Sequence, residues 1–435
     1  MTNKKSNILP IVVMYLLFFM IAFVTNLCNP MAVIVKNNFA MSNFAAQLGN
    51  AANFIAYAAM GIPAGMLLKK IGYRKTALVA ILVGFIGVFL QYMSGWAAIQ
   101  SFAVYLIGAF TAGFCMCMLN TVVNPMLNTL GGGGNKGNQL VQFGGVCNSL
   151  AAVLVTIIMG SLIADATKAQ IADATPALMI ALGVFAFAFI VLLLVKIPEP
   201  ELEISNDNNQ AVNGKKYSAF SFRHFNLGIL AIFLYMGVEV GVPTYVMQYL
   251  TTAPDATTPG LGINASIVGM IVAVYWLLML VGRLLGGMLA SKVSSRTQIA
   301  TVSAICLVLV LLGMFLPTDV MVNMPGVDWA TLTFMTAPVP VGIFALILVG
   351  LCTSVMWGGI FNMAVEGLGK YTSIASGAFM TMVCGGGILI PLQGKLADVF
   401  GNFQMSYVVV LACATYIFFY ALVGSKNVNK DIPTE

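Results

Sequence analysis

Asparagine and glutamine side chains recur inside the hydrophobic stretches of this chain, where polar groups are costly. Asn120, Asn124 and Asn128 follow one another at four-residue intervals in one apolar stretch, which places them on one face of a helix. An amide without a bonding partner in hydrocarbon is strongly unfavourable, so each one needs a partner. The amides that we take as candidate ligands of a polar solute are Asn26, Asn29, Asn50, Asn53, Asn120, Asn124, Gln142, Asn148 and Asn362.

The chemistry of these amides matches a solute that carries several hydroxyl groups. Each amide offers both donors and acceptors, as a sugar requires, whereas a cation site needs carboxylates. Trp276 and Trp357 fall near the same depth and could stack on the apolar face of a sugar ring. The alternative is that the amides only form hydrogen bonds between helices, which is worth about 1 kcal/mol each and is common in helical bundles.

Glu239 is the one acidic residue deep within an apolar stretch, in the sequence YMGVEVGVPTYV. A carboxylate in that position must be protonated, paired with a cation or bound to an ion. We therefore expect Glu239 to couple transport to a cation, H⁺ or Na⁺, or to accept a solute hydroxyl. A structural hydrogen-bonding role is the alternative.

Side chains for metal or nucleophilic chemistry are scarce. The eight cysteines all fall in apolar stretches without a C-x-x-C spacing, and His224 is the single histidine. We expect no cofactor, no metal site and no enzymatic activity.

The elements that carry these residues are membrane-spanning helices. The chain of 435 residues is 60% hydrophobic and 8% charged, with a mean hydropathy of +0.95, far from a soluble composition. Apolar stretches long enough to cross a bilayer recur throughout. The twelve spans we predict are 8–29, 45–68, 76–94, 99–128, 139–163, 176–197, 225–250, 262–290, 297–317, 339–366, 372–395 and 404–424.

The basic residues indicate the orientation of these spans. Sixteen of the 20 lysines and arginines fall in loops on one side, while Lys36, Lys168 and Lys395 fall on the other and Arg283 lies within a span. The positive-inside rule then places both termini in the cytoplasm, and we expect a bacterial inner-membrane protein. Anionic lipid accounts for the net charge of +6, so no nucleic-acid partner is needed.

The chain divides into two related halves. A polar segment, 196–224, separates an N-terminal bundle, 1–195, from a C-terminal bundle, 225–435, each with six predicted helices. The stretch 63–79 aligns without gaps with 285–301 and shares with it the pattern G-M-L-x-x-K-x-x-x-R. Two such halves typically open a central cavity alternately to either side of the membrane.

Basic residues at the ends of the repeated helices are candidates for an inner gate. Lys70 and Arg74 lie within the first copy of the repeat, Lys292 lies within the second, and Arg283 lies just before the second. Their side chains can bond the last carbonyls of a helix and hold two helices together. The alternative is that they only follow the positive-inside rule.

Several motifs together resemble the fucose, glucose/galactose and proton symporter family of the major facilitator superfamily. The motifs are Asn26-Leu27-Cys28-Asn29, Asn120-Thr121-Val122-Val123-Asn124-Pro125, Asn148-Ser149, Gly237-Val238-Glu239-Val240, the segment from Pro63 to Arg74 and the segment from Gly385 to Pro391. The resemblance covers nearly the whole chain. It implies an all-α membrane protein with the major facilitator fold, twelve transmembrane helices in two pseudo-symmetric six-helix bundles, that imports a monosaccharide by alternating access.

The departures from the family pattern concern coupling. In the family, acids implicated in proton coupling stand where this chain has Asn29 and Asn120, and a glutamine stands where it has Gly145. Because an amide cannot titrate, the inherited proton mechanism is in doubt. We expect a monomeric, cation-coupled symporter, with an uncoupled sugar uniporter or an antiporter of another small metabolite or drug as alternatives.

Overall fold

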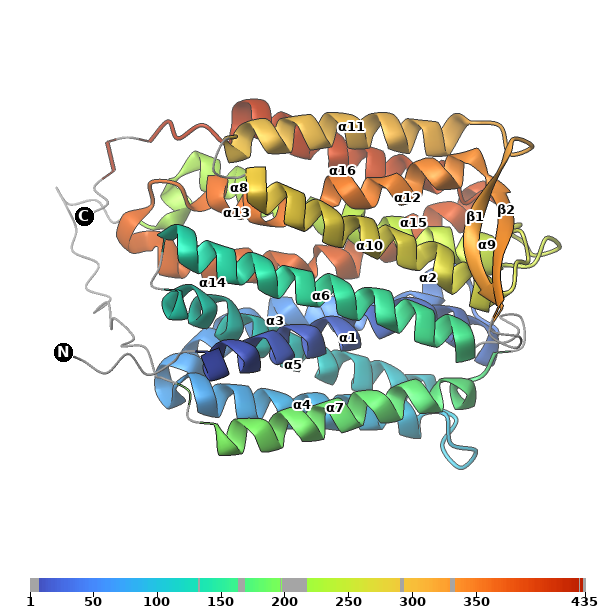
Figure 1. The fold of residues 1–435 in the computed structure, drawn as a ribbon, viewed down its shortest axis with the longest axis horizontal. Helices are drawn as coiled ribbons and strands as arrows, with labels where there is room; N and C mark the ends of the chain where they lie inside the picture. The colour runs from blue at the N-terminus through green and yellow to red at the C-terminus, as the bar shows by residue number, and fades with distance from the viewer. Residues whose placement is uncertain are drawn as a thin grey trace.

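The computed structural model describes residues 8–131, 134–162, 169–195, 197, 217–289, 293–328, 333–429 and 431–432. Within those residues it contains twelve helical spans that are long and apolar enough to cross a membrane. They lie side by side in two groups, the first half of the chain below and the second half above in the view of Figure 1. The predicted linker, 196–224, falls mostly outside the described residues.

The first half is built from continuous helices. They are α1 (Ile8–Asn38), α2 (Asn43–Ala46), α3 (Leu48–Ile71), α4 (Tyr73–Met93), α5 (Phe102–Leu130), α6 (Gly134–Leu162) and α7 (Thr175–Leu194). Helix α1 runs through Pro30 and ends nine residues beyond the predicted boundary at residue 29. The prolines of α1, α3 and α5 remain inside helices because packed neighbours hold the helix together where a proline removes a backbone hydrogen bond.

The second half contains three spans that are broken into shorter helices. Its elements are α8 (Arg223–Glu239), α9 (Gly241–Thr251), α10 (Ala265–Leu289), α11 (Ser295–Phe315), α12 (Val341–Thr353), α13 (Met356–Val365), α14 (Thr372–Thr381), the 3₁₀ turn η4 (Met382–Cys384), α15 (Gly385–Phe400) and α16 (Val408–Phe419). Three spans predicted as single helices are therefore interrupted. The interruptions leave backbone groups free for side chains to bond.

A β-hairpin lies between α11 and α12, where the sequence predicts a loop. Strand β1 (Met321–Asp328) pairs antiparallel with β2 (Thr333–Pro340), and β1 lies against α10. Prolines 325, 338 and 340 are unusual in strands, so sequence alone favoured a loop. Figure 1 shows the hairpin at one end of the helices, which we call the hairpin end; Lys70, Arg74 and Arg296 lie at the opposite, basic end.

The two halves approach each other most closely at the hairpin end. A Cβ atom on Gly160 of α6 would lie 2.9 Å from the Cα of Gly269 in α10, so these helices touch backbone to backbone. Toward the basic end, Gly65 of α3 and Gly377 of α14 would meet no atom within 4 Å. The bundles thus pack tightly at the hairpin end, and space remains beside these two glycines toward the basic end.

Candidate functional site

A chain of amide hydrogen bonds joins α3 and α5 in the first half. The Asn120 amide donates to the Tyr57 hydroxyl at 3.0 Å and to its own-helix carbonyl at Met116 at 3.1 Å. The Asn124 amide donates to the Asn120 carbonyl at 2.9 Å. Asn120 and Asn124 are half-buried, so their remaining polar atoms are within reach of a solute. Asn120 and Asn124 of the predicted stripe are therefore joined to each other and to Tyr57, while the side chain of Asn128 lies outside the described part of the structure.

A second group of amides lies along the first two turns of α3 and is more completely buried than Asn120 and Asn124. The Asn50 amide donates to Gln47 Oε1 at 2.6 Å. Asn53 is fully buried, and neither polar atom of its amide has a hydrogen-bond partner among the described residues. A buried amide without partners is costly, so it points to a group that this conformation does not supply. A solute can reach Asn53 only if the neighbouring helices move.

The other predicted amides are not gathered at one point. The Asn26 amide donates to Ala22 of its own helix at 2.8 Å, Asn148 is half-buried and Asn362 is exposed. The side chains of Asn29 and Gln142 lie outside the described part of the structure. Their assignment to the solute site stays a prediction.

In the second half, the polar centre forms where two helices are interrupted. Pro243 has no N–H to bond the carbonyl four residues earlier, that of Glu239, and α8 ends there. The Tyr275 hydroxyl donates to this carbonyl at 3.0 Å and lies 3.2 Å from Thr353 Oγ1, at the end of α12. The Tyr235 hydroxyl donates to the Thr353 carbonyl at 3.4 Å. The two interruptions are thus linked by tyrosines from α8 and α10.

Arg283 joins this centre to the opposite half. Its guanidinium lies 3.5 Å from Glu239 Oε1, with the two side chains 10% and 13% exposed. It also donates to Ser149 Oγ at 2.9 Å and to the carbonyl of Gly145, both in α6. A Cβ on Gly145 would lie 3.5 Å from Arg283 Cδ, an ordinary van der Waals distance, so the arginine side chain passes directly beside this position. Arg283 thus bonds both halves, and its role in gating stays a prediction.

The remaining gate candidates differ from Arg283 in their surroundings. Lys70 is exposed, and Arg74 donates to the Leu192 and Leu193 carbonyls at the end of α7, at 2.9 and 2.7 Å. Arg74 therefore stabilises the C-terminus of a helix in its own half. Lys292 lies outside the described residues, and a gating role for these residues stays a prediction.

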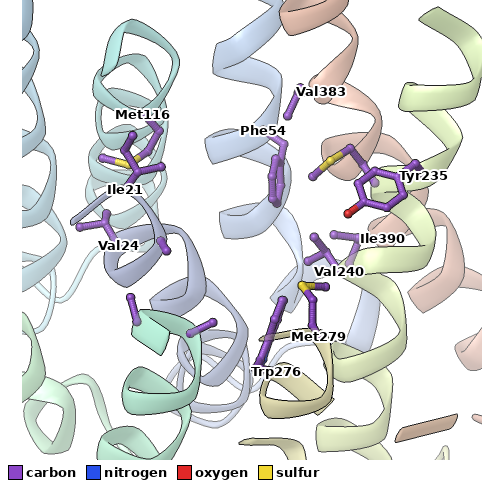
Figure 2. Close-up of a cluster of buried hydrophobic side chains, with 14 of the residues drawn as sticks. Ile21, Val24, Phe54, Met116, Tyr235, Val240, Trp276, Met279, Val383 and Ile390 are labelled. Carbon is purple, nitrogen blue, oxygen red and sulfur yellow. The ribbon is translucent and has the colours of Figure 1, made fainter. Parts of the chain in front are cut away.

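The predicted aromatic residues border the polar centre. The Trp276 ring is nearly buried and packs edge-on against Tyr275 at 5.2 Å, and Trp357 packs against Tyr235 at 6.1 Å. Figure 2 shows Trp276 beside Met279 and Val240, with Phe54 of α3 facing the group that includes Tyr235. Apolar and aromatic surface thus lies next to hydrogen-bonding groups, as in sites for small polar solutes.

Sequence reasoning missed the part played by the interruptions. Thr353, Tyr235 and Ser149 were not among the predicted site residues, although each bonds a group at the polar centre. The signal that could have found this region is Pro243, four residues after Glu239. Among the described residues, no group of three histidine, cysteine, aspartate or glutamate side chains could hold a metal ion.

A contact between α15 and α2 closes the hairpin end, and no sequence motif indicated it. Asp398 of α15 accepts a hydrogen bond from the Asn43 amide at 2.7 Å and another from the backbone N–H of Phe44 at 3.1 Å. Both donors belong to α2, in the other half. The carboxylate therefore holds the two bundles together through charge-assisted hydrogen bonds.

Comparison with known proteins finds relatives along the whole chain. It is 28% identical over 434 residues to a glucose/galactose transporter of Brucella abortus (strain 2308), with 98% of this chain and 96% of that one covered. It is 24% identical over 450 residues to the L-fucose-proton symporter of Escherichia coli (strain K12), with 98% and 95% covered.

Solved structures share the fold. The crystal structure of the transporter FucP in the outward conformation matches with a TM-score of 0.68 at 22% identity, over 97% of this chain and 100% of that one. The crystal structure of a D-xylose-proton symporter matches with a TM-score of 0.69 at 12% identity, over 98% and 100%. The predicted twelve-helix fold is confirmed.

Residues 14–391 match the family model of the Major Facilitator Superfamily. That match spans most of the chain and includes both polar centres and the contacts of Arg283 with α6. The chain belongs to the Major Facilitator Superfamily and is a multi-pass membrane transporter, not an enzyme.

Proposed function

We propose that this transporter imports a monosaccharide by alternating access. The observation that carries the proposal is the pair of polar centres, one on each half, with aromatic rings beside the second. The first offers the amides of Asn120 and Asn124 with the Tyr57 hydroxyl, and the second offers Glu239 and Arg283. Such alternating donors and acceptors suit a ring of hydroxyl groups. The names of the relatives, glucose/galactose transporter and L-fucose-proton symporter, support the same solute class.

We assign coupling to Glu239, with H⁺ or Na⁺ as the coupling ion. The two acidic positions of related symporters are Asn29 and Asn120 here, which leaves Glu239 as the one titratable carboxylate of the described spans in contact with the polar centre. Its partner Arg283 also bonds Ser149 in the opposite half. A cation that binds to Glu239 would weaken its pairing with Arg283 and so alter the contact between the halves.

An uncoupled uniporter is the second candidate, and the ion pair itself favours it. A carboxylate already paired with a guanidinium has its charge neutralised without a bound cation. In that mechanism the positive charge of Arg283 would neutralise Glu239 permanently, as a bound coupling cation does in symporters.

We place the protein in a bacterial inner membrane as a monomer, with the basic end in the cytoplasm. The distribution of lysine and arginine supports this orientation. In that orientation the contacts at the hairpin end close the outer side, and the basic end faces the cytoplasm.

The proposal is tested by uptake of labelled glucose, galactose and fucose into proteoliposomes under separate pH and sodium gradients. The parent protein should accumulate at least one of these sugars under one gradient. Glu239→Gln should lose accumulation but keep exchange of labelled for unlabelled sugar, because exchange needs no net cation movement. Asp255→Asn, an exposed loop carboxylate, is the control. Equal accumulation by Glu239→Gln and the parent would refute the coupling role, and transport of none of the sugars would refute the function.

A further inference from the structure

A cavity of about 150 Å³ lies at the hairpin end, between the two halves and away from both polar centres. The residues that line it come from α1, from α9 and from the loop after α9. They are Val33, Lys36, Asn37, Gln248, Thr251, Thr252, Ala253 and Ala256. Its volume is of the order of a small organic molecule such as benzene or a hexose.

Gln248 is the residue of this cavity that lacks partners. It is 2% exposed, and neither its Nε2 nor its Oε1 has a hydrogen-bond partner among the described residues. Burying an amide in this way is unfavourable unless something in the cavity bonds both atoms. Gln248 thus borders the cavity and carries one donor group and one acceptor that have no partner among the described residues in this conformation.

The neighbouring polar groups extend the same pattern. Lys36 Nζ donates to Thr252 Oγ1 at 3.4 Å. An ammonium group carries three N–H donors, so Lys36 can also donate to another group. The Thr251 hydroxyl donates to the Met247 carbonyl at 2.8 Å, so its oxygen can still accept. Asp398 interacts electrostatically with Lys36, and the charge of the region is therefore balanced. Balanced charge with mixed donors and acceptors favours a neutral, hydroxyl-bearing solute over an anion.

The position of the cavity relates it to the transport path. A much smaller cavity, about 10 Å³, shares Val33 and Thr251 with it and is also lined by Pro30, Gly160, Met247 and Ala265. The close contact of Gly160 with Gly269 lies at that constriction. Along α1, Lys36 lies on the hairpin side of Val33. Asn26 lies on the other side, about 10 Å from Val33 at 1.5 Å per residue. The larger cavity therefore lies directly outside the closed constriction.

We propose that the cavity lined by Gln248, Lys36 and Thr251 is a second solute site, which holds a neutral monosaccharide at the hairpin end while the path beneath it is closed. The proposal rests on the sugar transport proposed above and adds a site to it. Gln248 bonds two hydroxyls of the sugar through its amide, and Lys36 donates to another. When the bundles separate at this end, the sugar lies next to the opened path.

The test counts sugars bound to the purified full-length transporter by equilibrium dialysis with labelled glucose, galactose and fucose. The parent should bind about two molecules of the transported sugar per chain, one at the cavity and one at the central site. Gln248→Leu, which removes both polar atoms, and Ala256→Trp, which fills the cavity from a loop position, should each bind about one. Thr257→Trp, at the exposed neighbouring position, is the matched control and should bind about two.

A second arm separates this proposal from the proposed function. Asn120→Leu should lose the central sugar and keep the one at the cavity, and adding Ala256→Trp to it should abolish binding. If the parent transports a sugar but binds one per chain, and Ala256→Trp leaves that number unchanged, the second site is refuted while the transport function stands. A parent that neither transports nor binds any of the sugars refutes both.

Discussion

The guanidinium of Arg283 lies 3.5 Å from the Glu239 carboxylate, and the same group donates to Ser149 of the other half at 2.9 Å. The sole carboxylate of the polar centre is thus connected, through one side chain, to the contact between the two bundles. A change in the charge of Glu239 would therefore alter the contact that Arg283 makes with the other bundle. In the coupling mechanism proposed above, Arg283 is the residue that coupling and conformational change share.

The ion pair predicts a recovery of stability in a double variant. Arg283→Met leaves Glu239 buried without its cation, which should destabilise the protein by about 3 kcal/mol or more. Arg283→Met with Glu239→Gln should recover most of that loss, because no unpaired charge remains. Thermal unfolding in detergent measures both, with Arg296→Met, at a side chain that bonds Ser425, for comparison. A double variant as unstable as Arg283→Met would show that the pairing is not what stabilises this region.

The Tyr57 hydroxyl should contribute to solute affinity through Asn120. Tyr57→Phe removes the acceptor of the Asn120 amide, which is then less well oriented toward a sugar. Loss of one hydrogen bond of about 1 kcal/mol should raise KM about fivefold with a smaller effect on the maximal rate. Initial rates of uptake measure this, and Tyr92→Phe, at a ring that packs on Trp96, should leave KM unchanged. A fall in maximal rate alone would contradict the assignment.

The contact of Gly160 with Gly269 should be required for closure of the hairpin end. A Cβ at Gly269 would lie 2.7 Å from the Thr156 carbonyl, and one at Gly160 2.9 Å from Gly269 Cα. Gly160→Leu should therefore hold the bundles apart at this end and reduce uptake at least about tenfold, because the helices cannot approach. Gly183→Leu, where a Cβ meets no atom within 4 Å, is the control. Normal uptake by Gly160→Leu would exclude this role.

Asp398 should hold the hairpin end closed through its bonds to α2. Asp398→Ala removes two charge-assisted hydrogen bonds between the halves, at 2.7 and 3.1 Å. The open state should then become more populated, by about tenfold or more for bonds of about 1.5 kcal/mol each. The measurement is the rate at which an impermeant maleimide labels a cysteine placed at the buried Ala265, which lines the small cavity at the constriction. Asp255→Ala, in an exposed loop, should not change that rate. An unchanged rate in Asp398→Ala would argue against a role for Asp398 in holding this end closed.

The sequence by itself determined the twelve spans, the membrane location and the duplicated halves. These follow from the length and hydropathy of each stretch and from the repeat at 63–79 and 285–301, which are local properties of the chain. The stripe of Asn120 and Asn124 was also predictable, because residues four apart share a helix face. The hairpin at 321–340 was not, since its prolines disfavour strands and only the partner strand and α10 stabilise it.

Only the tertiary structure decided which polar residues meet. Glu239 and Arg283 are 44 residues apart, and Asn43 and Asp398 are 355 apart, so no periodicity relates them. The interruption after Glu239 is stable because Tyr275, on another helix, bonds the carbonyl that Pro243 leaves free. In a membrane interior a polar group must find its partner within the protein, and that partner is set by how the helices pack.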